Sequence, residues 1–245
     1  MTRLSVNLNK IALLRNQRDT GQPDLLACAD IILKAGAQGL TVHPRPDERH
    51  IRRQDIPDIA AFLESREETD IEFNIEGYPS PDFIRLVTRH ACDQVTLVPD
   101  DPDQKTSDHG WDVERHEERL RDVISQLKDA GRRVSLFIDP DPVMARAAAD
   151  VGADRVELFT GPFAFDPERL PDYVETSQAA KDAGLGINAG HDLNLDNLAG
   201  YISAIPYTAE VSIGHAITAD ALVMGWHGAV SAYLTAIQYG QKMAS

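Results

Sequence analysis

The sequence predicts an α/β protein folded as one (β/α)8 barrel, a TIM barrel, which occupies residues 1–245 as a single domain. The chain length of 245 residues is close to the roughly 250 residues typical of this fold. Eight short runs typical of β-strands also alternate with longer helical patterns from one end of the chain to the other. Eight such units close a barrel more naturally than they extend an open sheet.

The predicted strands are short runs of mostly apolar and β-branched residues. In chain order they read LSVNL, LTVH, IEFNI, VTLV, VSLFI, VELF, GINA and VSI. They cover residues 4–8, 40–43, 71–75, 95–98, 134–138, 156–159, 186–189 and 211–213.

The predicted helices lie between these strands. Residues 24–36, 113–131 and 144–154 carry apolar side chains at spacings of three and four, which favours helices. Glycines that suit C-terminal helix caps follow several helical patterns, at Gly36, Gly131, Gly152 and Gly184. The Pro- and Asp-rich residues 98–110 fall inside one βα unit, so we interpret them as an active-site loop rather than a domain boundary.

Composition excludes several classes of protein. A net charge of -15 and a pI near 4.8 argue against a nucleic-acid-binding surface, which needs a basic face. Cys28 and Cys92 show no paired spacing, so a disulfide framework or a structural zinc site is not expected. The N-terminus lacks the pattern of a secretion signal, and no apolar run reaches membrane-spanning length. We expect a cytoplasmic protein with no membrane partner.

Polar residues gather where the predicted strands end, and in such barrels chemistry takes place at the C-terminal ends of the strands. Three of these strands end near a histidine, at His43, His191 and His215. Other strands deliver carboxylates at Glu76 and Glu157. Imidazole, with an unperturbed pKa of about 6.5, can both accept and donate a proton near neutral pH. The pattern therefore predicts acid–base catalysis.

Each of these residues also has a purely structural explanation. Asn7 and Asp139 could cap helices, Glu157 could be a barrel carboxylate held by an arginine, and a single histidine could be a packing residue. A metal site is the competing use of the histidines, but neither HxH nor HExxH occurs. The chain also lacks GxGxxG and GxxxxGK[ST], and no lysine at a strand end suggests a Schiff base. We therefore expect no metal and no cofactor.

An anionic substrate fits the sequence better. In SIGHAITADAL, Gly214 ends a strand just before a helix, where free backbone N–H groups and the helix dipole favour a phosphate. A glycine there is also common turn chemistry. Arg18, Arg45 and His50 could add side-chain charge. Local cations on an acidic protein thus indicate phosphorylated substrates.

The segments VNLNKIALLRNQR, TVHPRPDERHI, NIEG, VSLFID, NAGHDL and SIGHAI occur in this order, and with them the chain resembles the pyridoxine 5'-phosphate synthase family. The resemblance covers nearly the full length. It implies a (β/α)8 barrel with extra helices and no metal or organic cofactor. It also implies condensation of 1-deoxy-D-xylulose 5-phosphate with 3-amino-2-oxopropyl phosphate to pyridoxine 5'-phosphate, phosphate and water.

The resemblance also assigns roles to residues. His43 and Glu76 would accept protons, His191 would donate one, and Glu157 would stabilise a transition state. Deoxyxylulose phosphate would be held by Arg45, His50 and Thr106. The amino-ketone phosphate would be held by Asn7, Arg18, Gly214 and His215, and Asp192 would be a further substrate-binding residue.

Two departures from the family pattern change the expected contacts. Many members have Asp-His where this chain has Asn9 and Lys10, and Gly where it has Asp192. A backbone contact at Asp192 would survive the change, but a carboxylate beside a phosphate would alter the binding of that phosphate. Lys10 receives no role.

Two other functions fit parts of the sequence. An isomerase or aldolase barrel acting on one sugar phosphate needs one phosphate site, whereas two separate cation groups suit two phosphorylated substrates. A barrel that only binds a phosphorylated ligand has no use for His43, Glu76 and His191 together. The resemblance also suggests a homo-oligomer, an octamer built from dimers. The alanine-rich residues 221–240 could supply its contact surface or form the last barrel helix.

Overall fold

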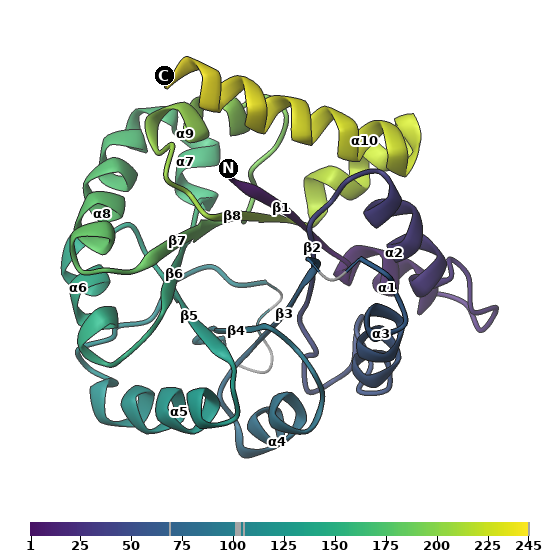
Figure 1. Cartoon of the computed structure of the whole chain (residues 1–245), viewed down its shortest axis with the longest axis horizontal. Coiled ribbons are helices and arrows are strands. Elements are labelled where there is room, and N and C mark those ends of the chain that lie inside the picture. The colour runs from purple at the N-terminus through teal and green to yellow at the C-terminus, as the bar shows by residue number, and fades with distance from the viewer. Residues whose placement is uncertain (69, 101–103, 105, 245) are drawn as a thin grey trace.

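The protein forms a closed barrel of parallel strands surrounded by helices (Figure 1). The structure is a computed structural model that describes residues 1–68, 70–100, 104 and 106–244. The strands follow one another around the barrel in chain order, and β8 pairs with β1 to close it. They are β1 (Arg3–Asn7), β2 (Gly39–Val42), β3 (Glu72–Gly77), β4 (Gln94–Leu97), β5 (Arg133–Ile138), β6 (Arg155–Leu158), β7 (Gly186–Ala189) and β8 (Glu210–Ile213). The predicted fold class is confirmed, and all eight predicted strands lie within one or two residues of these bounds.

Helices cover the outside of the barrel (Figure 1). They are α1 (Asn9–Arg15), α2 (Leu25–Lys34), α3 (Asp55–Glu64), α4 (Pro81–Arg89), α5 (Glu117–Asp129), α6 (Pro142–Asp150), α7 (Gly161–Phe165), the 3-10 helix η1 (Pro167–Arg169), α8 (Leu170–Asp182), α9 (Leu198–Ala204) and α10 (His215–Met243). The expected extra helices are present, since α1 precedes α2 between β1 and β2, and α7 precedes α8 between β6 and β7.

Helix boundaries differ from the prediction where local capping or packing decides them. Helix α5 begins at Glu117 rather than at residue 113, because Trp111 and Val113 are buried in the core before the helix starts. Helix α6 begins two residues early, where the Asp141 side chain accepts a hydrogen bond from the Val143 N–H. The four glycines predicted as helix caps all have positive φ, as a left-handed cap requires.

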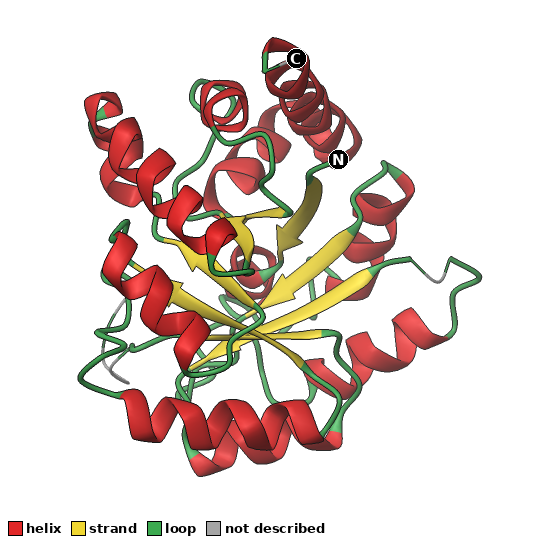
Figure 2. Ribbon diagram, turned by 60° about the vertical axis from the view of Figure 1, so that its left-hand side comes forward, coloured by secondary structure: helices red, strands yellow, loops and turns green. Residues whose placement is uncertain are grey.

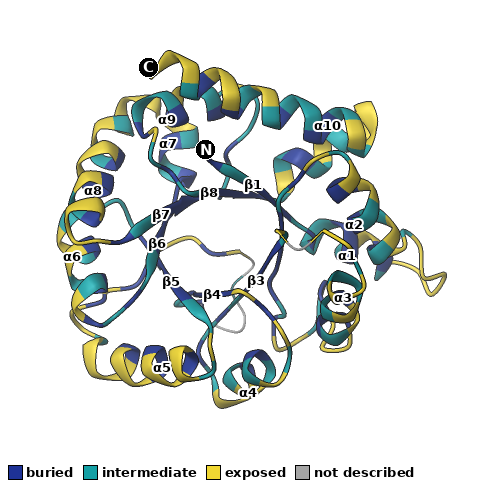
Figure 3. Ribbon diagram, viewed as in Figure 1, coloured by how far each residue is buried: buried dark blue, intermediate teal, exposed yellow. Residues whose placement is uncertain are grey.

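Residues that alternate along each strand form two different layers. One set is apolar and belongs to the core between strands and helices, as Leu4 and Val6 do on β1. In Figure 3 the helices are accordingly buried toward the barrel and exposed on the outside. The other set is polar and points into the barrel, since its side chains bond across it: Thr96 on β4 contacts Glu157 on β6, and Asn188 on β7 contacts Gln94 on β4. The usual filling of such a barrel is branched apolar side chains, so this interior is unusually polar.

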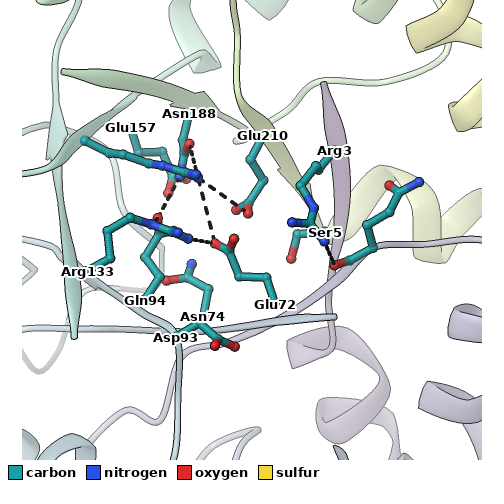
Figure 4. A network of polar contacts seen from close by, with 12 residues as sticks. Arg3, Ser5, Glu72, Asn74, Asp93, Gln94, Arg133, Glu157, Asn188 and Glu210 are labelled. Atoms are coloured by element: carbon teal, nitrogen blue, oxygen red, sulfur yellow. Dashed lines mark hydrogen bonds and ion pairs between the residues drawn. The ribbon is translucent and has the colours of Figure 1, made fainter. Parts of the chain in front are cut away.

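Charged residues occupy the N-terminal end of the barrel interior (Figure 4). Glu72 pairs with Arg133 and lies 3.8 Å from Arg155, measured between Oε1 and Nη1. Arg155 also lies 3.9 Å from Glu210. These are the first residues of β3, β5, β6 and β8, so the network ties together strands that are not neighbours. A buried charge without a partner costs several kcal/mol. Arrangements of the strands that separate these partners are therefore disfavoured, and the network constrains how the barrel closes.

The two ends of the chain meet on the same side of the molecule (Figure 2). The Gln241 side chain in α10 donates a hydrogen bond to the Thr2 hydroxyl over 3.1 Å. Helix α10 kinks at Gly225, which has φ 74°, and beyond the kink it buries Tyr233 and Ile237 against the body of the protein. None of the helices in the described residues is both long and apolar enough to span a membrane.

Candidate active site

A cavity of about 380 Å³ opens where the strands of the barrel end. The predicted site residues that line it are Asn7, His43, Arg45, His50, Glu76, Thr106, Glu157, His191, Asp192, Gly214 and His215. They come from loops and strands spread over the whole chain, and the closed barrel brings them together. Arg18 is exposed beyond the end of α1 and does not line the cavity. Its assignment to the amino-ketone phosphate stays a prediction from the resemblance.

His43 and Glu76 form a buried pair on neighbouring strands. His43 follows β2, Glu76 lies on β3, and 3.8 Å separates His43 Nδ1 from Glu76 Oε2. Burial, and next the Arg45 charge, lower the pKa of His43 well below its usual value. Burial, and next the Glu157 charge, raise the pKa of Glu76 well above its usual value. Both shifts favour the neutral forms, so this contact is not an ion pair in the free protein. A neutral imidazole is ready to accept a proton.

Two asparagines hold this pair in position. Asn9 Oδ1 accepts a hydrogen bond from the His43 backbone N–H over 2.9 Å. Asn7 Nδ2 donates to Glu76 Oε2 over 3.4 Å, while Asn7 Oδ1 accepts from the Asn9 N–H. The end of β1 therefore orients the residues that β2 and β3 deliver.

Glu157 lies deeper in the barrel, on β6, and is 4% exposed. Its Oε2 accepts a 3.5 Å hydrogen bond from the Thr96 hydroxyl. Burial raises the pKa of Glu157 to about 7, against the opposing effect of His191. A carboxyl group with such a pKa can exchange a proton near neutral pH.

His191 follows β7, and its ring is held on several sides. The ring packs edge-on against Phe159 with 5.2 Å between centroids. Its Nδ1 lies 3.0 Å from Asp192 Oδ2, and its Nε2 lies 2.9 Å from the Thr106 hydroxyl. The His191 carbonyl accepts a 2.6 Å hydrogen bond from the Thr160 hydroxyl. These contacts fix both the orientation of the ring and the position of its backbone.

Positive and donor groups gather on the side of the cavity formed by the loop after β2. Arg45 is buried and pairs with the buried Asp100. Burial, followed by the Arg45 charge, lowers the pKa of His50 to about 4, so its ring is neutral. His50 Nδ1 accepts a hydrogen bond from the Ile51 N–H over 2.9 Å, which leaves the proton on Nε2. This side of the cavity therefore offers hydrogen-bond donors to an anion.

A second donor region lies at the start of α10. Gly214 is the N-cap of this helix, and His215 is its first residue. A Cβ atom on Gly214 would lie 3.1 Å from Asn7 Cβ, so glycine keeps this approach open. The N-terminal backbone N–H groups of a helix favour an anion, and an anion site here stays a prediction from the sequence.

Several lining residues were not assigned roles from the sequence. They are Asn9, Lys10, Leu13, Arg49, Val98, Ser107, Phe137 and Ser212. Asn9 and Lys10 follow a predicted strand, and Ser107 lies in the predicted active-site loop, so their positions in the sequence could have indicated that they line the cavity. Residues 101–103 and 105 of that loop lie outside the described part of the chain.

Metal ligation has no obvious place in the described residues. Among them, no group of three or more His, Cys, Asp or Glu side chains could hold a metal ion. The cavity instead combines proton-exchanging groups with donors for anions on two sides.

Comparison with known proteins identifies relatives over nearly the whole chain. A sequence model of the family described as "Pyridoxal phosphate biosynthesis protein PdxJ" matches residues 4–239. The pyridoxine 5'-phosphate synthase of Chelativorans sp. (strain BNC1) is 53% identical over 245 residues, which is 96% of this chain and 98% of that protein. The enzyme of the same name from Mesorhizobium japonicum is 52% identical over 241 residues, with the same shares of both chains.

Solved structures with low sequence identity share the fold. Tryptophan synthase from M. tuberculosis superimposes with a TM-score of 0.63 at 14% identity, over 98% of this chain and 93% of that chain. Phosphoribosyl anthranilate isomerase from Thermus thermophilus gives a TM-score of 0.60 at 13% identity, over 97% of this chain and 98% of that chain. These similarities concern the barrel and not its chemistry.

Proposed function

The chain belongs to the PdxJ family of pyridoxal phosphate biosynthesis proteins, and we propose from its site how it works as a pyridoxine 5'-phosphate synthase. In this role it acts in vitamin B6 biosynthesis. It condenses 1-deoxy-D-xylulose 5-phosphate with 3-amino-2-oxopropyl phosphate to give pyridoxine 5'-phosphate, phosphate and water.

The two sides of the cavity suit two phosphorylated substrates. In the proposal, Arg45, His50 and Thr106 hold deoxyxylulose phosphate. The amino-ketone phosphate binds near Asn7, Gly214 and His215, where the backbone of α10 begins. Arg45 is already paired with Asp100, so this arginine is held in place before any substrate binds. Preorganised donors lose less entropy when a ligand arrives.

The reaction needs protons removed and delivered at different positions of one intermediate. Imine formation, loss of phosphate, loss of water and ring closure all involve proton transfer, which no single residue can serve. In the proposal, neutral His43 accepts a proton, and Glu76, whose pKa is raised by burial, is a strong base once ionised. His191 donates a proton to the departing hydroxide, and Glu157 stabilises the charge that develops. The convergence of these four groups on one cavity carries the proposal.

Turnover with both substrates tests the function. The wild-type protein is expected to release phosphate and form pyridoxine 5'-phosphate only when both phosphorylated substrates are present. An isomerase or aldolase would convert one sugar phosphate alone, and a binding protein would convert neither.

His191→Asn tests the proposed acid. We expect the variant to fold and to bind both substrates but to lose turnover by at least about a hundredfold, because removing a general acid typically costs about 10²–10⁴ in rate. Single-turnover kinetics measures this, with calorimetry as the binding control. Product formation at nearly the wild-type rate would remove His191 from the mechanism.

The remaining parts of the proposal concern the whole protein. We propose that residues 1–245 form one domain, that the protein acts in the cytoplasm, and that it assembles as a homo-oligomer, an octamer by the family resemblance. Leu222 and Val223, just before the kink in α10, are 77% and 87% exposed, which supports a contact surface there. Analytical ultracentrifugation tests the assembly.

A further inference from the structure

Asp192 has an unusual backbone conformation immediately after His191. Its φ is 64°, in the left-handed region that non-glycine residues seldom adopt. The Asp192 carbonyl accepts hydrogen bonds from the side chains of Asn194 and Asn197, each over 3.3 Å. The Leu193 N–H also bonds the Gly190 carbonyl over 3.0 Å. The turn is thus held by its neighbours, and strained conformations of this kind gather at functional sites.

This conformation brings the Asp192 carboxylate to the imidazole beside it. Asp192 Oδ2 lies 3.0 Å from His191 Nδ1. The hydrogen bond from His191 is the main cause that lowers the pKa of Asp192, so the side chain is a carboxylate. A carboxylate can only accept hydrogen bonds, so His191 Nδ1 carries a proton. Nε2, which contacts Thr106, is then the ring nitrogen left for the substrate.

The other charged groups around this pair come from different elements. Glu157 on β6 interacts with His191, while Lys10 on α1 and His215 on α10 interact with Asp192. Two acidic groups therefore interact with His191, and Asp192 is the one whose hydrogen bond reaches the ring. A carboxylate on Nδ1 sets the tautomer of an imidazole and stabilises its charged form.

We propose that Asp192 is a positioning residue that orients the His191 ring and holds a proton on Nδ1, so that Nε2 is the nitrogen that serves the substrate. The inference rests on the proposed role of His191 in synthase turnover. It differs from a direct contact between the Asp192 side chain and the amino-ketone phosphate, because a carboxylate repels phosphate.

Three substitutions at Asp192 separate these roles. We expect Asp192→Asn and Asp192→Gly to lower kcat by at least about tenfold, because the ring loses its orienting acceptor, with KM for both substrates within about threefold of wild type. Asp192→Glu should restore part of kcat. Glycine favours positive φ, so Asp192→Gly should melt no lower than wild type. Asp196→Asn is the matched control: it removes one negative charge from an exposed position four residues along the chain, does not line the cavity, and should leave kcat unchanged.

Two further measurements distinguish positioning from a structural effect. In the His191→Asn background, Asp192→Gly should cause no further loss of kcat, since the residue acts through the ring. Nitrogen-15 NMR of the wild-type His191 ring should show a proton on Nδ1.

Three results would overturn the inference: a neutral ring protonated only on Nε2, a change in KM alone, or an equal loss of kcat with and without His191. If instead the wild-type protein fails to convert the two substrates, the proposed function fails, while the NMR result still reports on the Asp192–His191 bond.

Discussion

Burial raises the pKa of Glu157 to about 7, so the contribution of this residue to the stability of the protein depends on pH. Between its ordinary value near 4.5 and about 7, the folded state holds a proton that the unfolded state has lost. Its stabilising contribution is therefore complete at low pH and is lost as the pH rises through 7.

Glu157→Gln should remove this dependence, because an amide stays neutral at every pH. The free energy of unfolding of the variant should rise relative to wild type between pH 5 and pH 8, by about 2–3 kcal/mol. Denaturant unfolding at several pH values measures it. The exposed Glu118→Gln is the control and should give a curve parallel to wild type. If the Glu157→Gln curve were also parallel to wild type, Glu157 would not be protonated in the folded state.

At this scale the sequence predicted most of the cavity, because position after a strand is a local signal. It did not predict that Arg45 is paired with Asp100, since these residues lie 55 positions apart and no local pattern joins them. Nor did it show that His50 is neutral, since that follows from burial between charged neighbours that only the fold creates.

The turn after β7 shows how one element depends on the next. Gly190, directly before His191, packs against β8 so closely that an added Cβ would lie 2.1 Å from the Ser212 carbonyl oxygen. The neighbouring atom belongs to the backbone of a buried strand, so it cannot move aside cheaply. Glycine at this place therefore sets the distance between His191 and the rest of the site.

Gly190→Ala should destabilise the protein by about 1–3 kcal/mol through overpacking and should lower turnover by displacing His191. Gly200→Ala in α9 is the matched control, because nothing lies within 4 Å of its added Cβ. It should stabilise the helix by about 0.5–1 kcal/mol with unchanged activity. Thermal unfolding and steady-state kinetics of both variants measure these effects, and equal behaviour of the two would contradict the packing argument.

Element boundaries were predictable where local chemistry sets them and not where packing does. The glycine caps after α2, α5, α6 and α8 follow from the preference of glycine for positive φ. The later start of α5 accompanies the burial of Trp111 and Val113 in the core before the helix begins. Residues 221–240 differ on the two sides of the kink at Gly225: the part after it packs as the last barrel helix, and the part before it exposes apolar side chains.

For the whole molecule, the repeated strand and helix pattern was enough to predict a closed barrel. The polar filling of the barrel was not predicted, because its contacts join residues far apart in the chain, such as Glu72 with Arg133 and Arg155 with Glu210. Figure 4 shows this filling reaching from the charged network to Glu157, which is one of the residues that line the cavity. The residues inside the barrel therefore form part of the surroundings that set the pKa of Glu157.

The hydrogen bond between Gln241 and Thr2 has a consequence for how the barrel can be connected. A closed ring of strands has no inherent first member, and ends that already touch can be joined by a short flexible linker. A circular permutant opened between Ala183 and Gly184, in an exposed turn at the opposite end of the barrel from the cavity, should keep the fold and the turnover of the parent chain. Circular dichroism and a turnover assay would measure this. A permutant that folds but is inactive would mean that the site depends on where the chain begins and ends. An active permutant would show that the closed arrangement of the eight strands is sufficient to form the site.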